Sequence, residues 1–460
     1  MDRRQFMKHA GALGVAVSIG YINQKEAHAA KSFKARFRNP VKVSNGWDVI
    51  VVGGGPSGCA AAAAAAREGA HVLVIESTGA LGGMGTSGLL NCWCPFTDGE
   101  KIIYRGIAEK VFLESKKGVP DVKGNNWVPI NTEYLKRVYD KLMACYHVHV
   151  LFFSSVADVE MKGDGTVEAV VVANKAGLTA FQSKVFIDCT GDGDIAAWSG
   201  AQFNFGDSNN AVQSGSLCFS IANINHDAYM KIGTVQSGNK RSPIHQMLAS
   251  GEYDLITDGH INDKYPGHGY LMFNAGHVPV DSTDPESLSA AIVRGRKTAE
   301  QFKDGLAKYC PEVFADSYLA ATGSLMGIRE SRRIRCDYTF SIEDWLERRE
   351  FEDNIGRNCY YIDVHNVDAV KYPRYSRGES HGIPLRCLLP VGLKNVIVAG
   401  RCISTDHATQ GSLRVMPPAM VTGEAAGVAA GLICHSCNID IHSVTVSDVQ
   451  KRLRQEGQLL

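Results

Sequence analysis

The chain has 460 residues, of which 45% are hydrophobic and 21% are charged, close to the averages for soluble globular proteins. This composition excludes disorder, collagen and coiled coil as descriptions of the whole chain. The 48 basic side chains balance 48 acidic ones, so we expect no nucleic-acid partner and no anionic membrane held by bulk charge.

The first thirty residues have the layout of an export signal. Arg3 and Arg4 precede Phe6-Met7-Lys8, an apolar run covers residues 10–20, and Ala27-His28-Ala29 follows. The run is about half of the ~20 residues that span a bilayer, so no stable membrane span is expected. The Arg-Arg-x-Phe-Met-Lys segment resembles the twin-arginine consensus. We therefore expect residues 1–29 to direct a folded protein, loaded with its cofactor, to the periplasm or another extracytoplasmic compartment; a basic N-terminus in a cytoplasmic protein is the alternative.

The 13 cysteines are an odd number and are scattered along the chain. Only Cys92 and Cys94, and Cys434 and Cys437, lie close together in sequence. Neither a disulfide scaffold nor a paired set of metal ligands follows from this spacing. We predict no metal.

A nucleotide-binding pattern begins at residue 48. Residues 48–52 (DVIVV) read as a buried strand, residues 53–58 (GGGPSG) as a turn, and the alanines up to residue 66 as a helix. In such a turn Gly53 permits the tight bend, Gly55 lets the backbone approach a pyrophosphate, and Gly58 lets the helix lie close to the strand. The helix N-terminus offers unpaired N–H groups to phosphates.

A second strand, residues 71–75, ends at Glu76, which can accept hydrogen bonds from a ribose. A second glycine-rich stretch, residues 79–88, follows directly. In flavoproteins related to glutathione reductase this stretch runs beside an extended FAD. It therefore favours FAD over a nicotinamide cofactor.

Distant segments extend this likeness. Residues 184–194 resemble the ATGD-type motif of two-dinucleotide-fold flavoproteins, residues 393–404 resemble the last strand and the loop under the flavin, and residues 411–427 open a helix. Together with residues 323–333, they make the chain resemble the FAD-dependent oxidoreductase family, which is related to the fumarate-reductase and glutathione-reductase flavoproteins, over about residues 46–435. The resemblance implies an α/β fold, namely an FAD-binding Rossmann-like three-layer domain of GR2 type with an inserted α+β substrate or cap domain.

The resemblance also implies the cofactor FAD and a set of residues that bind it. These are Gly53, Gly55, Pro56, Ser57, Gly58, Glu76, Gly83, Met84, Val156, Gly191, Asp192, Gly400, Arg401, Val415 and Met416.

We divide the chain into the signal at 1–29, a first FAD-binding part at 46–205, a substrate or cap domain at 206–388, and a return to the FAD-binding domain at 389–440. The first part is expected to hold helices at 107–117 and 132–146 and a hairpin at 155–173. The cap is expected to combine a mixed sheet, with strands at 216–222 and 270–274, and a helix at 285–307.

Three residues are the candidates for catalysis. His407 follows the loop that reaches the flavin, and its ordinary pKa suits an acid or base. Arg414 could stabilise charge on the reduced flavin, and Arg386 is a further site candidate. His407 could instead only hydrogen-bond FAD or backbone, and each arginine could be structural. Residues 381–386 (HGIPLR) precede the return to the FAD-binding domain, and the family has a related aromatic-x-Ile-Pro-Tyr-Arg stretch there. The chain departs from that stretch at His381 and Leu385.

A second arginine group, Arg329, Arg332 and Arg333, could clamp a substrate carboxylate, or could pair with acids at the domain junction.

The sequence thus predicts an oxidoreductase for a small polar organic substrate, with a preference for dehydrogenating a sugar-like alcohol or an amine. Reduction of an activated C=C bond, as in fumarate reductases, is one alternative, although the spacing of His407 and Arg414 differs from theirs. A non-catalytic flavin electron carrier is another. Because a second GxGxxG motif is not visible, the electron partner is expected to be an external donor or acceptor.

Overall fold

A computed structural model describes residues 40–365 and 372–460, and the predicted signal at residues 1–29 lies outside these ranges. Residues 42–460 form one unit, which is described here. No helix within the two described ranges has the length and apolar character needed to cross a membrane.

A parallel sheet forms the centre of this unit. Strand β1 (Lys42–Val52) pairs in parallel with β2 (Val72–Ile75) on one side and with β6 (Gly177–Asp188) on the other. Strands β3 (His149–Leu151) and β15 (Val396–Val398) extend it, again in parallel. The β-branched residues of β1 and β2 are buried, as predicted for strands covered on both faces.

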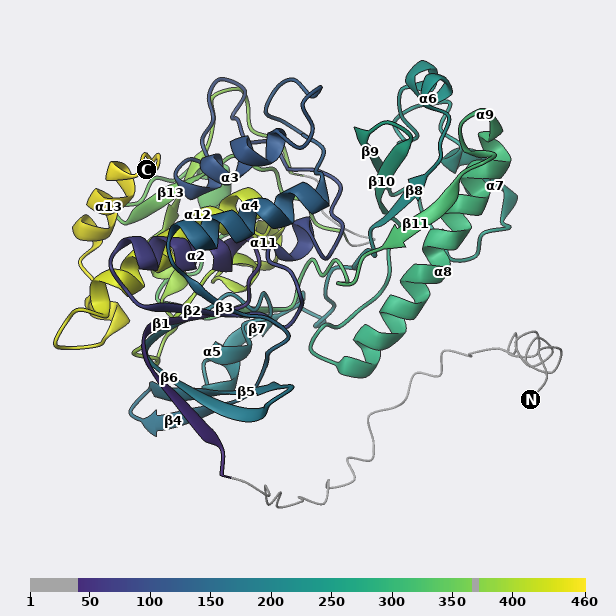
Figure 1. The fold of residues 1–460 in the computed structure, drawn as a ribbon. Coiled ribbons are helices and arrows are strands. Elements are labelled where there is room, and N and C mark those ends of the chain that lie inside the picture. Colours follow the sequence, from purple (N-terminus) through teal and green to yellow (C-terminus); the bar gives the residue numbers. More distant parts are fainter. Residues whose placement is uncertain (1–39, 366–371) are drawn as a thin grey trace. The chain divides into compact units, whose positions relative to one another are not determined.

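An antiparallel hairpin continues the same sheet. Strand β5 (Thr166–Asn174) pairs with β6 and with β4 (Ser155–Gly163), which confirms the predicted hairpin. Figure 1 shows helices α2 (Pro56–Arg67), α3 (Ile107–Lys116), α4 (Thr132–Cys145) and α12 (Met416–Ile433) on one side of β1–β3, with the hairpin on the other. The predicted helices at 107–117 and 132–146 are confirmed within one residue.

Helices α2 and α12 pack with their backbones almost touching. The alanines of α2 are buried, and nearly every residue of α12 is buried. A methyl group on Gly423 would overlap the carbonyl oxygen of Ser57, and one on Gly427 would overlap that of Ala61. Small residues on both helices therefore fix how closely the two N-termini approach.

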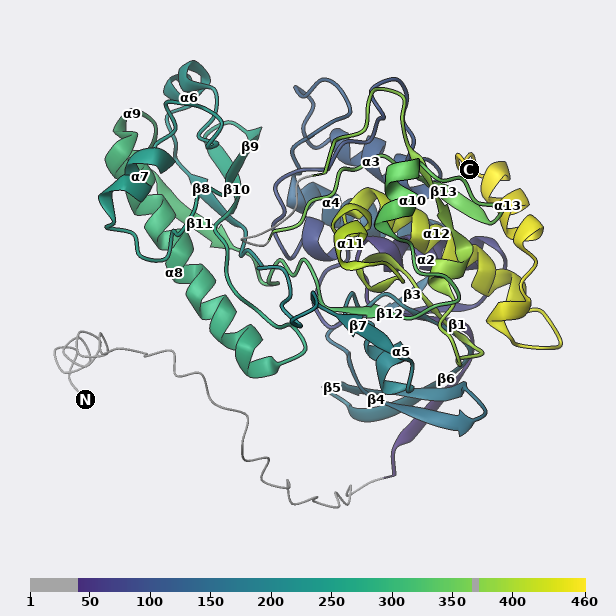
Figure 2. The ribbon, with the colours of Figure 1, turned by 180° about the vertical axis from the view of Figure 1, so that it is seen from behind.

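A second sheet has the strand order β11 (Tyr318–Thr322), β8 (Phe219–Ala222), β10 (Tyr270–Ala275) and β9 (Ile261–Gly267). All its pairings are antiparallel, so the expected mixed sheet is corrected: β9 and β10 form a hairpin, and β8 and β11 both run opposite to their neighbours. The long helix α8 (Pro285–Tyr309) lies along this sheet (Figures 1 and 2). This part has its own hydrophobic cluster, built around Phe219, Phe273 and Phe302.

Shorter elements complete the fold. Two small antiparallel pairs are formed by β7 (Phe203–Phe205) with β12 (Arg332–Ile334), and by β13 (Asn354–Asn358) with β14 (His381–Pro384). The remaining helices are α5 (Asp194–Trp198), α6 (His226–Ile232), α7 (Ile244–Ser250), α9 (Pro311–Phe314), α10 (Ile342–Glu347), α11 (His407–Leu413) and α13 (Val446–Gln455), with 3₁₀ turns η1 (Gly83–Gly85), η2 (Leu385–Leu388), η3 (Gly400–Cys402) and η4 (Ile441–Ser443).

The packing does not break at the predicted boundary at residue 388. The large core that surrounds the parallel sheet contains Ile334, Trp345 and Ile383 as well as Val396. The second cluster draws its members from residues 219–314. The predicted domain limits remain predictions.

Candidate cofactor and substrate site

A cavity of about 560 Å³ opens where the parallel strands end. Its lining includes the last residues of β1 and β2, and Cys189, directly after β6. In open α/β sheets, ligands bind outside the carboxyl ends of the strands. The size of the cavity is in the range of small-molecule and cofactor sites.

The glycine turn and the start of α2 form one wall of the cavity. Gly53 has a φ of 96°, and a side chain there would overlap the carbonyl oxygen of Cys189. A methyl group on Gly55, the N-cap of α2, would meet nothing within 4 Å. Among the described residues, no side chain caps α2, whereas Asn131 and Asp284 cap α4 and α8. The first N–H groups of α2 are therefore available to an anion, as predicted for a pyrophosphate.

Gly58 supports this wall from outside the described lining. A methyl group on Gly58 would overlap the carbonyl oxygen of Gly53, so the residue permits the close packing that the motif requires. The described lining of the cavity includes Gly53, Gly55, Pro56 and Ser57 but not Gly58.

Glu76 also lines the cavity and is fixed by backbone donors. Its Oε2 accepts from the Gly54 amide at 2.7 Å, and its Oε1 accepts from the Thr78 amide at 2.7 Å. Val156, the predicted adenine contact at the start of β4, lines the same cavity. The carboxylate is held in place for hydrogen bonds to a ribose.

The middle of the cavity combines the second glycine stretch with the loop after β6. Gly83, Met84, Gly191 and Asp192 all line it. The Asp192 carboxylate accepts from Nη1 of Arg401 at 2.9 Å. Burial alone would raise the pKa of Asp192, but the charge of Arg401 holds it below its ordinary value.

A second helix N-terminus faces the cavity. Val415 is the N-cap of α12, Met416 is its first residue, and both line the cavity together with Gly400 and Arg401. As for α2, none of the described side chains caps this helix, and prolines occupy its first turn. Its partial positive charge is therefore directed at whatever occupies the cavity.

These features fit FAD. One uncapped helix N-terminus would hold the diphosphate, a carboxylate would bind the ribose, and a second uncapped N-terminus would lie near the electron-rich edge of the ring system. Close packing of α2 and α12 places the two N-termini on one cavity.

The cavity continues beyond these residues into a wall supplied by the second sheet and by the segment before β12. Ser216, Cys218 and Asn274 come from the region of β8 and β10, and Arg329 from the segment 324–329. Arg414, the residue before α12, lies in the same lining. We call these residues the polar end of the cavity; none of them belongs to the set predicted to bind FAD, and apolar side chains such as Leu325 and Met326 line the same wall.

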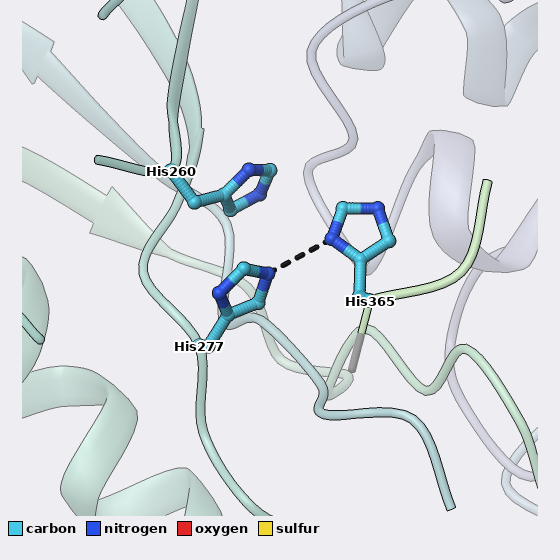
Figure 3. A group of neighbouring side chains, drawn as sticks. All are labelled: His260, His277 and His365. Atoms are coloured by element: carbon cyan, nitrogen blue, oxygen red, sulfur yellow. Dashed lines mark hydrogen bonds between the residues drawn. The ribbon is translucent and has the colours of Figure 1, made fainter. Parts of the chain in front are cut away.

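A hydrogen-bonded network lies behind this wall, and three histidines form its centre (Figure 3). His277 hydrogen-bonds Asp258 through Nδ1 at 2.7 Å and His365 through Nε2 at 2.8 Å. His365 in turn lies 3.2 Å from Asp363. Each carboxylate can accept from the outer ring N–H of its histidine, and the two inner ring nitrogens face each other.

His260 joins the network to the cavity wall. Its Nε2 accepts from Nη2 of Arg329 at 3.2 Å, and its ring stacks on His277 with centroids 4.5 Å apart. Burial and then the charge of Arg329 hold the pKa of His260 well below its ordinary value, and they lower that of His365 to about 4.

One ring nitrogen of each of these histidines lies within 4.8 Å of the others, a spacing that a metal ion could use. The guanidinium of Arg329, however, lies beside His260 with a fixed positive charge, and His277 and His365 already bond to each other. Both features suit a hydrogen-bond network better than a cation site.

Comparison with protein families identifies the chain. The sequence model of the family described as FAD dependent oxidoreductase matches residues 48–453. The chain belongs to this family. It is therefore a flavoenzyme with FAD as its cofactor, and the simple electron-carrier alternative is set aside.

No curated protein sequence matches this oxidoreductase. Solved structures that it resembles include a geranylgeranyl bacteriochlorophyll reductase-like protein from Thermoplasma acidophilum (13% identity, 90% of this chain and 83% of that one, TM-score 0.42). Others are p-nitrophenol 4-monooxygenase PnpA from Pseudomonas putida DLL-E4 (13%, 90% and 84%, 0.44) and the flavin-dependent brominase Bmp2 (12%, 90% and 83%, 0.45). At these scores the likeness carries no argument about chemistry.

Two of the three predicted catalytic residues of the oxidoreductase lie elsewhere. His407 bonds through Nδ1 to Glu330 at 2.8 Å and borders a second cavity with Arg333. Arg386 is half exposed and pairs with Asp353 at 3.0 Å. Of the three, the described lining of the large cavity contains Arg414 alone. The catalytic roles of His407 and Arg386 remain predictions.

The second arginine group divides between two roles. Arg332 pairs with Asp194 at 2.7 Å and Arg333 with Glu330, both of which are structural contacts. Arg329 alone faces the cavity. The histidine network was missed because its members, His260, His277 and His365, are far apart in sequence and no local motif connects them.

Proposed function

We propose that this FAD-dependent oxidoreductase dehydrogenates a small polar organic substrate, an alcohol or an amine, at the polar end of the large cavity. The observation that carries the proposal is the continuity of this cavity from the nucleotide-binding turn of α2 to the wall formed by Ser216, Asn274 and Arg329. FAD, when bound, supplies a two-electron acceptor for the hydride of the substrate.

The residues of the chain itself would position the cofactor and the substrate and stabilise developing charge. The turn at 53–57 and Glu76 would hold the adenosine diphosphate half, and Gly400, Val415 and Met416 would hold the ring half. The N-terminus of α12 stabilises negative charge that develops near it. Ser216 and Asn274 offer hydrogen bonds that orient a hydroxyl or an amine.

Dehydrogenation also releases a proton from the hydroxyl or amine, and a base must accept it. His407 remains our predicted base.

Reduction of an activated C=C bond is the second candidate function. It is favoured by the presence of Arg329 and Arg414 in one cavity lining, since two guanidinium groups can bind the electron-withdrawing group that activates such a bond. The reductase would take its electrons from an external donor.

Anaerobic mixing separates the two functions. We expect the yellow, FAD-loaded protein to bleach with one class in a panel of sugars, hydroxy acids and amines. Chemically reduced protein that is reoxidised by activated alkenes, together with no bleaching by the panel, contradicts the dehydrogenase proposal and supports the reductase. Free FAD in the same buffer is the control.

We further propose that residues 1–29 direct export by the twin-arginine route, and that residues 46–205 and 389–440 form a GR2-type FAD domain with the cap between them. The motif Arg3-Arg4 supports the first part, and the parallel sheet with α2 and α12 supports the second. Replacing both arginines by lysine should retain the protein in the cytoplasm; periplasmic protein at the unchanged level contradicts export by this route.

A further inference from the structure

We infer that the substrate carries a carboxylate, which Arg329 and Arg414 bind at the polar end of the cavity. These two side chains are called the anion subsite below. The inference rests on the proposed function, since it takes this end of the cavity as the substrate site, and it names the substrate class: a small organic acid.

Arg329 is a buried cation that no described carboxylate contacts as an ion pair. The residue is 5% exposed, and its donors reach the Ser214 carbonyl oxygen at 2.6 Å and Nε2 of His260 at 3.2 Å. Within residues 40–365 and 372–460, no carboxylate forms an ion pair with it. Burial, and then the charge of Arg414, lower the pKa of Arg329 to about 10. A buried charge is costly unless it is paired, so an anionic ligand would stabilise this arrangement.

Arg414 also has donor capacity to spare. Its Nη2 donates to the Asp363 carbonyl oxygen at 2.9 Å and lies 3.5 Å from the Asp363 carboxylate. Its Nε is buried, and in the described part of the chain it has no hydrogen-bond partner. A guanidinium group with free donors on a cavity wall matches the geometry of a carboxylate.

The balance of charge in this region favours an anionic ligand. Asp363 is the acid that faces the two arginines, and it is shared with His365. Asp258 is at the other end of the network and is occupied by His277. Two guanidinium groups therefore face one shared carboxylate, which leaves a positive excess at the wall.

The network also holds the anion subsite rigid. His260 accepts from Arg329, and Asp363, fixed by His365, accepts from Arg414. Preorganised donors lose little freedom when a ligand binds. We therefore assign His260 and His365 as positioning residues for the two arginines.

The phosphates of FAD do not account for this excess. The uncapped start of α2 and the turn at 53–57 provide the phosphate site. Arg414 instead directly precedes Val415 and Met416, at the start of α12. The anion subsite is thus at the ring end of the cofactor site, where a substrate meets the flavin.

Titration of the FAD-loaded, oxidised protein tests the inference. Acetate, succinate and benzoate are compared with acetamide, succinamide and benzamide, and the change in the flavin absorption spectrum gives each dissociation constant. At least one acid should bind at least tenfold more tightly than its amide. Equal binding of every acid and its amide by protein that retains FAD overturns the inference.

Variants locate the site. Arg329→Gln and Arg414→Gln should each weaken binding of the preferred acid at least tenfold, with binding of its amide unchanged. Arg377→Gln is the matched control, because that side chain is 76% exposed. If both cavity variants still bind FAD and still prefer the acid to its amide, the assignment to these arginines is wrong. If the wild-type protein does not bind FAD, the proposed function itself is wrong.

Discussion

Glu76 has every feature of a cofactor ligand that is set in place before the cofactor arrives. Both carboxylate oxygens accept a backbone N–H at 2.7 Å, and the side chain is 7% exposed. The donors are Gly54 in the glycine turn and Thr78, two residues after Glu76, so the side chain connects the turn to the segment that follows β2. Charge matters here because hydrogen bonds to a carboxylate are stronger than those to an amide.

We predict that Glu76→Gln weakens FAD binding by about tenfold or more, since the amide end of glutamine would face one backbone N–H and lose a charged hydrogen bond of about 1.5–3 kcal/mol. Fluorescence titration of the apoprotein with FAD measures the effect. Glu100→Gln, at an exposed position, should bind FAD as the wild type does. Equal affinity of the two variants would show that Glu76 does not contact the cofactor.

His381 shows how a departure from the family pattern is accommodated. The histidine stands where the family has an aromatic residue, and its buried ring stacks on Phe340 with centroids 4.6 Å apart. Asn358 donates to its Nε2 at 3.0 Å. Burial lowers the pKa of His381 to about 4, so the ring is neutral in the folded protein at neutral pH.

A pH dependence follows from this histidine. Between about pH 6.5, the ordinary pKa of histidine, and about pH 4, the unfolded chain binds a proton at His381 that the folded chain does not bind. The free energy of unfolding therefore falls as the pH falls through this window, by on the order of 3 kcal/mol. His381→Gln should flatten the acid side of the stability profile measured by urea unfolding. His260 and His365 add to the wild-type slope, so the variant reduces it without abolishing it. His245→Gln, at an exposed position, should keep the slope; an unchanged slope in His381→Gln contradicts the prediction.

At the scale of elements, the contact between α2 and α12 is the feature on which the cavity depends. Gly427 faces Ala61 and Ala64, and a methyl group there would overlap the Ala61 carbonyl oxygen. Both helices present their N-termini to the cavity. A change in their separation should thus alter stability and cofactor binding together.

We predict that Gly427→Ala lowers the free energy of unfolding by about 1–3 kcal/mol, the usual cost of overpacking, and also weakens FAD binding. Gly238→Ala is the matched control, because it is exposed and a methyl group there meets no atom within 4 Å. Guanidinium unfolding and FAD titration measure the two effects. A Gly427→Ala protein as stable as the Gly238→Ala protein would mean that the helices separate without cost.

The elements also show what local sequence can and cannot predict. Strands β1 and β2 and helices α3, α4 and α8 carry strong periodic or compositional signals, and the structure confirms them. The strand expected from residue 216 begins at Phe219 in β8, and the pairing of β8 with both β10 and β11 depends on distant partners. Tertiary pairing of this kind leaves no local pattern.

The same limit applies to the site. The structure places 14 of the 15 predicted cofactor residues in the lining of one cavity, because short glycine-rich motifs mark their segments in the sequence; their contact with FAD remains a prediction. The polar half is assembled from residues near 216, 274, 329 and 414. The sequence alone does not distinguish Arg329 from Arg332 and Arg333. In the fold, Arg332 and Arg333 each pair with an acid, and Arg329 does not.

At the scale of the whole molecule, the cavity is a junction of remote segments. Its lining runs from Val52 to Ala419 and draws on the parallel sheet, α2, α12 and the wall next to the second sheet. A ligand that fills the cavity would contact several of these segments at once and so connect them. Ligand binding to the folded state alone stabilises it, by about 2.7 kcal/mol at a concentration one hundred times the dissociation constant.

We therefore predict that FAD raises the melting temperature of the apoprotein in a concentration-dependent way, and that each of its two halves raises it less. Riboflavin lacks the diphosphate that the start of α2 binds, and ADP lacks the ring that the start of α12 meets, so each should give a smaller shift than FAD at equal concentration. Thermal unfolding followed by circular dichroism, which is insensitive to flavin fluorescence, measures all three. Our assignment places the diphosphate at α2 and the ring at α12. A shift with riboflavin alone that equals the shift with FAD would contradict the first placement, and a shift with ADP alone that equals it would contradict the second.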